Sequence, residues 1–189
     1  MSPPAPPARG QRFALFGECL LTGLLVTLAA VPVVTLLAAL AAGAAQISAH
    51  VDGESTALRA FAGRLRSAYP GSAGWSLGAA GAFALLALDA AVLRTRVPGG
   101  GLVAVVSGLT AVGLAVLLLR AGALWRPGDR WPDLLRRAAH RTVVADRSGS
   151  LLLVLALGLL ALVTWQLLPL LVPMIGCVVM AAVATERRP

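Results

Sequence analysis

An uncharged stretch near the start of this chain runs from Cys19 to Ala49, and its length limits how the chain can fold. Its 31 residues would make one straight helix about 46 Å long. The hydrocarbon core of a bilayer is only about 30 Å thick. Pro32, near the middle, removes a backbone donor and disfavours helical geometry at Val31. We therefore expect a reversal around residues 30–33 that gives two short helices. One tilted, kinked helix is the alternative.

Similar apolar runs recur along the chain, and together they predict an all-α, polytopic transmembrane helical bundle. Of the 189 residues, 58% are hydrophobic and 13% are charged, whereas roughly a quarter are charged in soluble domains. Lengths of about 17–25 residues suit membrane-spanning helices. We expect a disordered cytoplasmic tail over 1–12, a transmembrane domain over 13–186 and a cytoplasmic tail over 187–189. The six predicted spans are 13–30, 33–50, 73–93, 101–123, 149–167 and 170–186.

The arginines predict how these spans are oriented. All sixteen basic residues are arginine, and with a reversal at Pro32 fourteen of them fall on one side, leaving only Arg94 and Arg96 on the other. A kink at Pro32 would weaken this split to twelve against four. Basic residues favour the cytoplasmic side, so we expect a multi-pass protein of the cell membrane with both termini in the cytoplasm. Pro169 and Pro173 leave the same choice between reversal and kink open for the last run.

The net charge of +8 has the same explanation, because an arginine excess in cytoplasmic loops is the usual orientation signal of a membrane protein. We therefore expect a lipid bilayer, and no nucleic acid, as the partner of these charges.

Two connections on the predicted cytoplasmic side have the pattern of amphipathic helices, over residues 55–69 and 132–145. The first carries an apolar stripe of Leu58, Phe61 and Leu65 beside arginines, with Asp52 or Ser55 as a possible cap. The second places Leu135 next to Arg136. Such helices adsorb to anionic headgroups or dock a protein partner. Leu58, Phe61, Leu65, Leu135 and Arg136 are our candidate docking residues.

The opening "GECLLTGLLVTLAAVPVVTLLAALAAGAA", the basic helix "ESTALRAFAGRLR" and the segment "LLLRAGALWRPG" resemble the YesL-like family of bacterial integral membrane proteins, a family of unknown function. The similarity covers nearly the whole chain through its hydropathy layout and a few positions. Members of that family are often associated with carbohydrate-utilisation loci and sugar ABC importers. The resemblance therefore implies an ABC importer as a possible membrane or cytoplasmic partner, and it implies no catalytic residues.

Glu18 and Asp89 are acids within predicted spans, where a carboxylate costs several kcal/mol unless it is paired, protonated or hydrated. One interpretation makes them ion-coupling or substrate groups of a small secondary transporter. The other makes them structural, with Glu18 reaching the interface or pairing with Arg120, and with Asp89 pairing with Arg94.

Other polar residues suggest no chemistry. His50 and His140 have no second histidine or acid at ligand spacing, so we expect no metal site and no cofactor. No Ser/His/Asp set at membrane depth indicates a hydrolase. We therefore expect a non-enzymatic accessory or scaffold subunit, which the family resemblance associates with carbohydrate uptake, with the small secondary transporter as the alternative.

Overall fold

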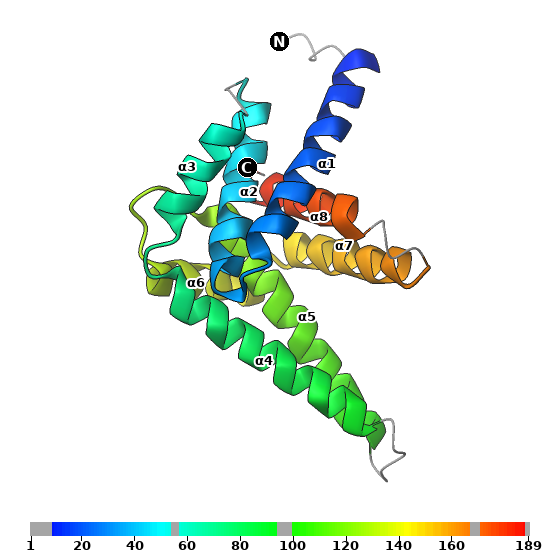
Figure 1. Cartoon of the computed structure of the whole chain (residues 1–189). Helices are drawn as coiled ribbons and strands as arrows, with labels where there is room; N and C mark the ends of the chain where they lie inside the picture. The colour runs from blue at the N-terminus through cyan, green and yellow to red at the C-terminus, as the bar shows by residue number, and fades with distance from the viewer. Residues whose placement is uncertain (1–8, 54–56, 94–99, 167–170, 188–189) are drawn as a thin grey trace.

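A computed structural model of the chain describes residues 9–53, 57–93, 100–166 and 171–187 (Figure 1). Every regular element in these ranges is helical, which confirms the all-α prediction. The elements are α1 (Arg9–Ala30), the 3-10 turn η1 (Val33–Thr35), α2 (Leu36–Val51), α3 (Leu58–Ala68), α4 (Ser72–Leu93), α5 (Gly100–Leu124), α6 (Trp131–His140), the π-helical turn η2 (Arg141–Ala145), α7 (Arg147–Gln166) and α8 (Leu171–Glu186).

The chain reverses at Pro32, as the length of the first apolar run predicts. Pro32 is extended, with φ −76° and ψ 97°, because its ring and its missing N–H prevent α1 from continuing. The hydroxyl of Thr35 donates to the carbonyl oxygens of Ala29 and Pro32 and so satisfies acceptors at the end of α1. Beyond the turn, α2 packs along α1, and a Cβ atom at Gly43 would overlap the side chain of Val26.

The chain ends differ from the predicted tails. Helix α1 already begins at Arg9, so the last four residues of the predicted 1–12 tail are helical, while residues 1–8 lie outside the described part. At the other end, Arg187 forms an ion pair with Asp52 and is fixed against α2. Asp52 therefore holds the end of the chain instead of capping α3, whose N-cap position is Ala57.

Helix α2 is the centre of the molecule, with ten buried residues. It packs against α1, α3, α5 and α8. The approach of α5 is close because Gly122 has no side chain: a Cβ atom there would stand 3.1 Å from the Cβ of Leu40. Helix α8 crosses α1 in the same way at Gly176, where an added Cβ would overlap the carbonyl oxygen of Cys19. Small residues thus allow the helices to pack backbone to backbone.

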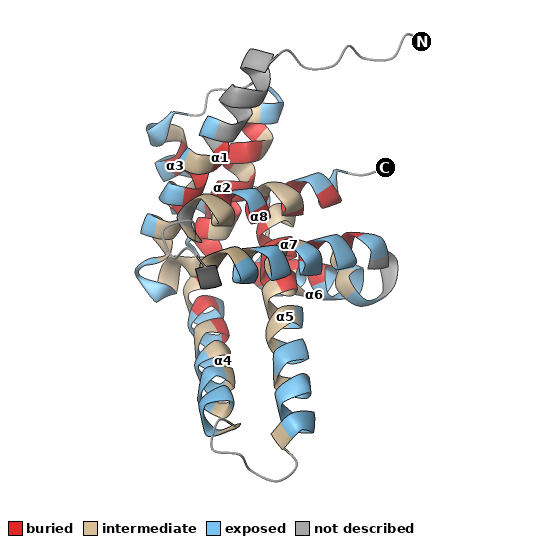
Figure 2. Ribbon diagram, turned by 90° about the vertical axis from the view of Figure 1, so that its right-hand side faces the viewer, coloured by how far each residue is buried: buried red, intermediate tan, exposed pale blue. Residues whose placement is uncertain are grey.

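The hairpin of α1 and α2 and the hairpin of α4 and α5 lie at opposite ends of the molecule (Figure 1). Helices α1, α2 and α3 occupy one end, the paired helices α4 and α5 project at the other, and α6, α7 and α8 lie between them (Figures 1 and 2). The projecting part of α4 and α5 is mostly exposed and apolar (Figure 2). Its exposed large side chains include Leu85, Leu88, Val92, Leu102, Val105 and Leu109. The described residues of the six predicted segments are helical. The helices do not lie side by side as one bundle of parallel helices (Figures 1 and 2).

Within the described residues, three helical segments are long and apolar enough to cross a membrane: Val33–Val51, α4 and α5. Shorter apolar helices cover Cys19–Ala30 and Pro173–Glu186. The stretch from Trp131 to Thr164 passes the same test only as two helices bent by 95°. These lengths and compositions are compatible with a membrane protein.

Candidate functional site

Arg120 is the most deeply buried charged residue that the structure describes. Its side chain has 0% exposure, although it lies on the mostly apolar helix α5. Gly122 allows the last third of α5 to pack closely against α2. The residues around Arg120 on α5 are therefore buried as well. A buried guanidinium needs acceptors for its donors and an opposite charge, since desolvation of an unpaired ion costs several kcal/mol.

Two carboxylates from the ends of other helices supply the opposite charge and accept from both terminal nitrogens, whereas the buried Nε has no acceptor among the described residues. Arg120 Nη2 donates to Asp146 Oδ2 at 2.8 Å and also to the Asp146 carbonyl oxygen and Ser150 Oγ, at 3.2 and 3.3 Å. Arg120 Nη1 donates to Glu186 Oε1 at 3.1 Å. Asp146 precedes α7 and Glu186 ends α8, so one side chain of α5 joins the start of α7 to the end of α8.

Asp146 is held in place by the first turn of α7. Its Oδ1 accepts the backbone N–H of Gly149 at 2.8 Å and the hydroxyl of Ser148 at 3.1 Å, the arrangement of a helix N-cap. The Gly149 N–H and, next, the Arg120 guanidinium lower the pKa of the Asp146 carboxyl below its usual range. A Cβ atom at Gly149 would overlap this carboxylate, so position 149 has room only for glycine. The carboxylate therefore serves the helix end and Arg120 together.

Glu186 is shared between two arginines. Its second oxygen accepts from Arg141 in η2, and its side chain is only 7% exposed. The buried cluster thus contains two arginines and two carboxylates, and its formal charges cancel. Such a cluster links α5, η2, α7 and α8 through its two buried members, Arg120 and Glu186, whose charges would be costly without their partners.

A second ion pair closes the same side of the molecule. Arg187 donates from both terminal nitrogens to Asp52, at 2.8 and 2.6 Å, and to the Ser48 carbonyl oxygen at 3.2 Å. This bidentate contact lowers the pKa of Asp52 and raises the pKa of Arg187. It ties the residue after α8 to the end of α2.

Of the two predicted intramembrane acids, the structure describes the side-chain contacts of Asp89 alone. Asp89 accepts a hydrogen bond from Ser107 Oγ across the α4–α5 hairpin. Arg94, its expected partner, lies outside the described residues. The side chain of Glu18 also lies outside the described part, and the ion pairs of Arg120 that the structure describes are with Asp146 and Glu186.

The predicted docking residues divide between surface and core. Leu58 is 63% exposed, and Arg136 is exposed on α6. Leu65 and Leu135 are half-buried against the core. Phe61 is only 5% exposed and packs in a cluster with Val26, Ala39 and Ala42, which corrects its prediction as an anchor on the surface: it belongs to the chain's own core.

The two basic amphipathic helices meet at one corner. Trp131, the first residue of α6, is buried, and its Nε1 donates to the carbonyl oxygen of Ala68, the last residue of α3, at 3.1 Å. Gly71, with φ +77°, makes the turn that follows α3, and a Cβ there would stand 3.5 Å from the indole. Sequence patterns predict each helix but not this contact between them.

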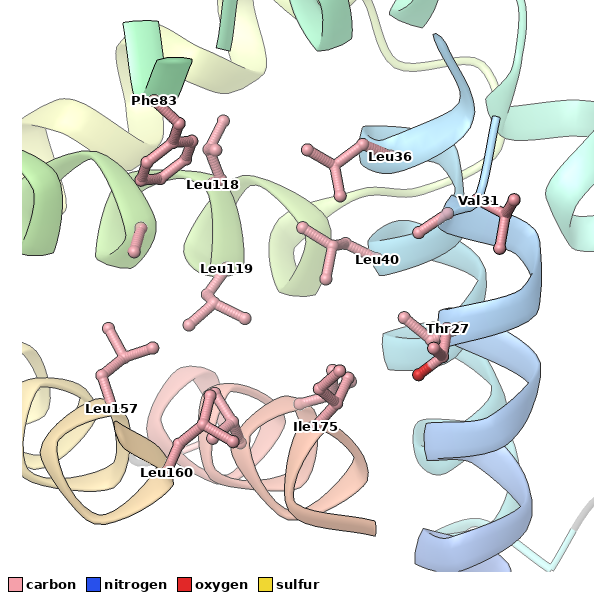
Figure 3. A pocket seen from close by; sticks show the side chains of 15 residues that line it. Thr27, Val31, Leu36, Leu40, Phe83, Leu118, Leu119, Leu157, Leu160 and Ile175 are labelled. Carbon is pink, nitrogen blue, oxygen red and sulfur yellow. The ribbon is translucent and has the colours of Figure 1, made fainter. Parts of the chain in front are cut away.

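A cavity of about 350 Å³ lies among α1, α2, α5, α7 and α8 (Figure 3). Thr27 is the only one of its fifteen lining residues with a polar side-chain atom, and its hydroxyl donates to the carbonyl oxygen of Gly23 at 2.7 Å. This lining has no free group to orient a sugar or an ion. Among the described residues, no three His, Cys, Asp or Glu side chains form a metal-binding group.

The site therefore consists of ion pairs that hold helix ends together: the buried Arg120 with Asp146 and Glu186, and the pair of Arg187 with Asp52. Comparisons of the chain with protein-family models, with curated proteins and with solved structures find no match.

Proposed function

We propose that the chain is a multi-pass protein of the cell membrane that acts as a non-enzymatic accessory or scaffold subunit. The observation that carries the proposal is the corner between α3 and α6. There the Trp131–Ala68 hydrogen bond connects the end of one basic amphipathic helix to the start of the other, beside apolar helices of membrane-spanning length.

Membrane insertion is supported most directly by the α4–α5 hairpin. Its two helices are 22 and 25 residues long, and they expose leucine and valine side chains along their length. Exposed apolar surface of this extent is unfavourable in water and favourable in lipid. The arginine distribution supports six crossings with both termini in the cytoplasm, which places α3 and α6 on the cytoplasmic side.

A scaffold role is supported by the ion pairs of the buried charge cluster. Arg120, Asp146, Glu186 and Arg141 form ion pairs that connect three helices, whereas a transport cycle needs a charge that changes partners. On the outer side of α3 and α6, Leu58 and Arg136 are exposed and available to a partner. The resemblance to the YesL-like family supports a sugar ABC importer as that partner.

Photo-crosslinking tests the proposal. A photoreactive amino acid at Leu58, in the native host, is expected to give one discrete adduct with a membrane or cytoplasmic protein. Leu109 is the matched control, because it is similarly exposed, at 69% against 63%, but lies on the projecting hairpin. Lipid adducts alone at both positions would refute the accessory role.

A small secondary transporter is the second candidate, and the Asp89–Ser107 hydrogen bond favours it. This carboxylate lies within an apolar hairpin, and Ser107 lines a cavity of about 400 Å³ between α4 and α5. The transporter proposal predicts ion-driven uptake in vesicles that Asp89→Asn abolishes at normal expression. Absence of uptake by the unaltered protein would refute it.

A further inference from the structure

A third cavity, distinct from the two apolar ones, lies beside the charge cluster and is rich in arginine. Its volume is about 450 Å³, within the range of small-molecule sites. It is lined from α2, α3, the α5–α6 connection, η2 and the end of α8. Its charged lining residues are Arg64, Arg126, Arg141, Arg187, Asp52 and Glu186.

The charges in this cavity do not cancel. Arg141 is paired with Glu186, and Arg187 is paired with Asp52. Arg64 donates to the side-chain oxygen of Gln46, which is neutral. Within the part of the chain that the structure describes, neither Arg64 nor Arg126 has a carboxylate at ion-pair distance. The cavity therefore carries two positive charges in excess of its own carboxylates.

Arg64 is half-buried and Arg126 is exposed, and both line this one cavity, where a bound anion would balance their charge. Guanidinium donors form a planar fork that matches the oxygens of phosphate, often in bidentate geometry. A phosphate monoester carries a charge of about −1.5 to −2 at neutral pH, which matches the excess. Arg141 and Arg187 line the same space, where each is already paired with a carboxylate, so the excess charge is that of Arg64 and Arg126.

We propose that this cavity is a binding site for a phosphate monoester dianion, with Arg64 and Arg126 as its principal charged ligands. The site goes beyond the accessory role, because it does not use Leu58 or the exposed face of α6. Two sources supply this chemistry: a soluble phosphorylated metabolite, or the headgroup of phosphatidic acid, which is a phosphate monoester in the bilayer.

The test uses the full chain purified in an uncharged detergent and titrated with inorganic phosphate by calorimetry at low salt. Arg64→Gln with Arg126→Gln is expected to weaken phosphate binding at least tenfold. The matched control, Arg59→Gln with Arg66→Gln, removes the same charge from exposed positions of α3 and is expected to keep the affinity of the unaltered protein. Arg64→Lys with Arg126→Lys keeps the charge but not the fork, so it should bind more weakly while folding normally, which circular dichroism checks.

Nanodiscs distinguish the two sources. Binding of soluble phosphate that depends on Arg64 and Arg126 identifies a metabolite site. Binding only in discs with phosphatidic acid, and not in discs with phosphatidylglycerol at equal charge, identifies a lipid headgroup site. No binding of either probe, or equal loss in the cavity and control variants, overturns the proposal. Neither result bears on the crosslinking test at Leu58, so the two proposals fail separately.

Discussion

Arg120 and Asp146 are 26 positions apart in the chain, and they meet through a 2.8 Å hydrogen bond between a fully buried guanidinium and the carboxylate that caps α7. The contact joins the last third of α5 to the start of the C-terminal helical pair. Glu186 completes it from the end of α8. The relative positions of three helices therefore depend on one arginine side chain.

Replacement of Arg120 tests this dependence. Arg120→Ala leaves Asp146 without its arginine and Glu186 with Arg141 alone, and breaking a buried pair typically destabilises by about 3–5 kcal/mol. The control is Arg137→Ala, whose ion pair with Asp129 is on the surface, with 55% of the arginine side chain exposed. A surface pair contributes about 0–1 kcal/mol. Denaturant titration in detergent micelles measures both, and an Arg120→Ala variant as stable as Arg137→Ala would contradict the structural role.

Replacement of Gly149 tests the helix cap that Asp146 forms at the start of α7. Gly149→Ala places a methyl group against the Asp146 carboxylate, so the cap and the contact with Arg120 must both shift. We expect a loss of about 2 kcal/mol or more, as for a lost N-cap combined with strain. Gly158→Ala, in the middle of the same helix, meets no atom within 4 Å and should stabilise α7 by up to about 1 kcal/mol. Equal effects of the two changes on the thermal midpoint would show that Gly149 has no special surroundings.

The pH dependence of stability follows from the lowered pKa of Asp146. A carboxyl whose folded pKa is below its unfolded value of about 3.9 stabilises the fold fully above that value and loses this contribution as pH falls through the folded pKa. The thermal midpoint should therefore be flat from about pH 7 to 5 and should fall below about pH 4. Asp146→Asn should lower the midpoint at pH 7 and flatten the acid decline. A decline of unchanged steepness in Asp146→Asn would assign acid sensitivity to other groups, of which Asp52 is the first to replace.

The helices could be predicted from the sequence because each depends on local information. Apolar run lengths set the helix ends to within a few residues, and Pro32 marks a reversal through its missing N–H and fixed φ. The stripe of Phe61 and Leu65 likewise predicted an amphipathic helix. The pattern does not say what an apolar face covers, and for Phe61 the answer is α1 and α2.

The charge cluster could not be predicted, because it depends on contacts across long sequence separations. Arg120 and Glu186 are 66 positions apart, and nothing local distinguishes Glu186 from the other acids near a helix end. Asp146 did offer a signal: an acid just before an apolar run, with Gly149 three positions later, has the spacing of a helix cap. The placement of the α1–α2 and α4–α5 hairpins at opposite ends of the molecule depends on close helix packing, as at Gly122, and is not visible in hydropathy (Figure 1).

The first hairpin crosses the membrane if the six-span proposal is right, and the turn at Val31 then faces the outside. Val31 is 71% exposed, so a cysteine there is accessible without disturbing the core. In a background with Cys19 and Cys177 replaced, Val31→Cys should react with an impermeant maleimide added to intact cells. Reaction only after the cells are opened would place the α1–α2 hairpin on the cytoplasmic side and reduce the number of crossings.

The most direct test of membrane topology compares Thr95→Cys, between α4 and α5, with Arg136→Cys on α6, in the same cysteine-free background. The account predicts that the protein stays in the membrane fraction at alkaline pH, that Thr95→Cys is labelled by the impermeant maleimide in intact cells, and that Arg136→Cys is labelled only after lysis. Release from the membrane at alkaline pH, or labelling of both positions from the same side, would contradict a crossing α4–α5 hairpin and, with it, the proposed membrane protein.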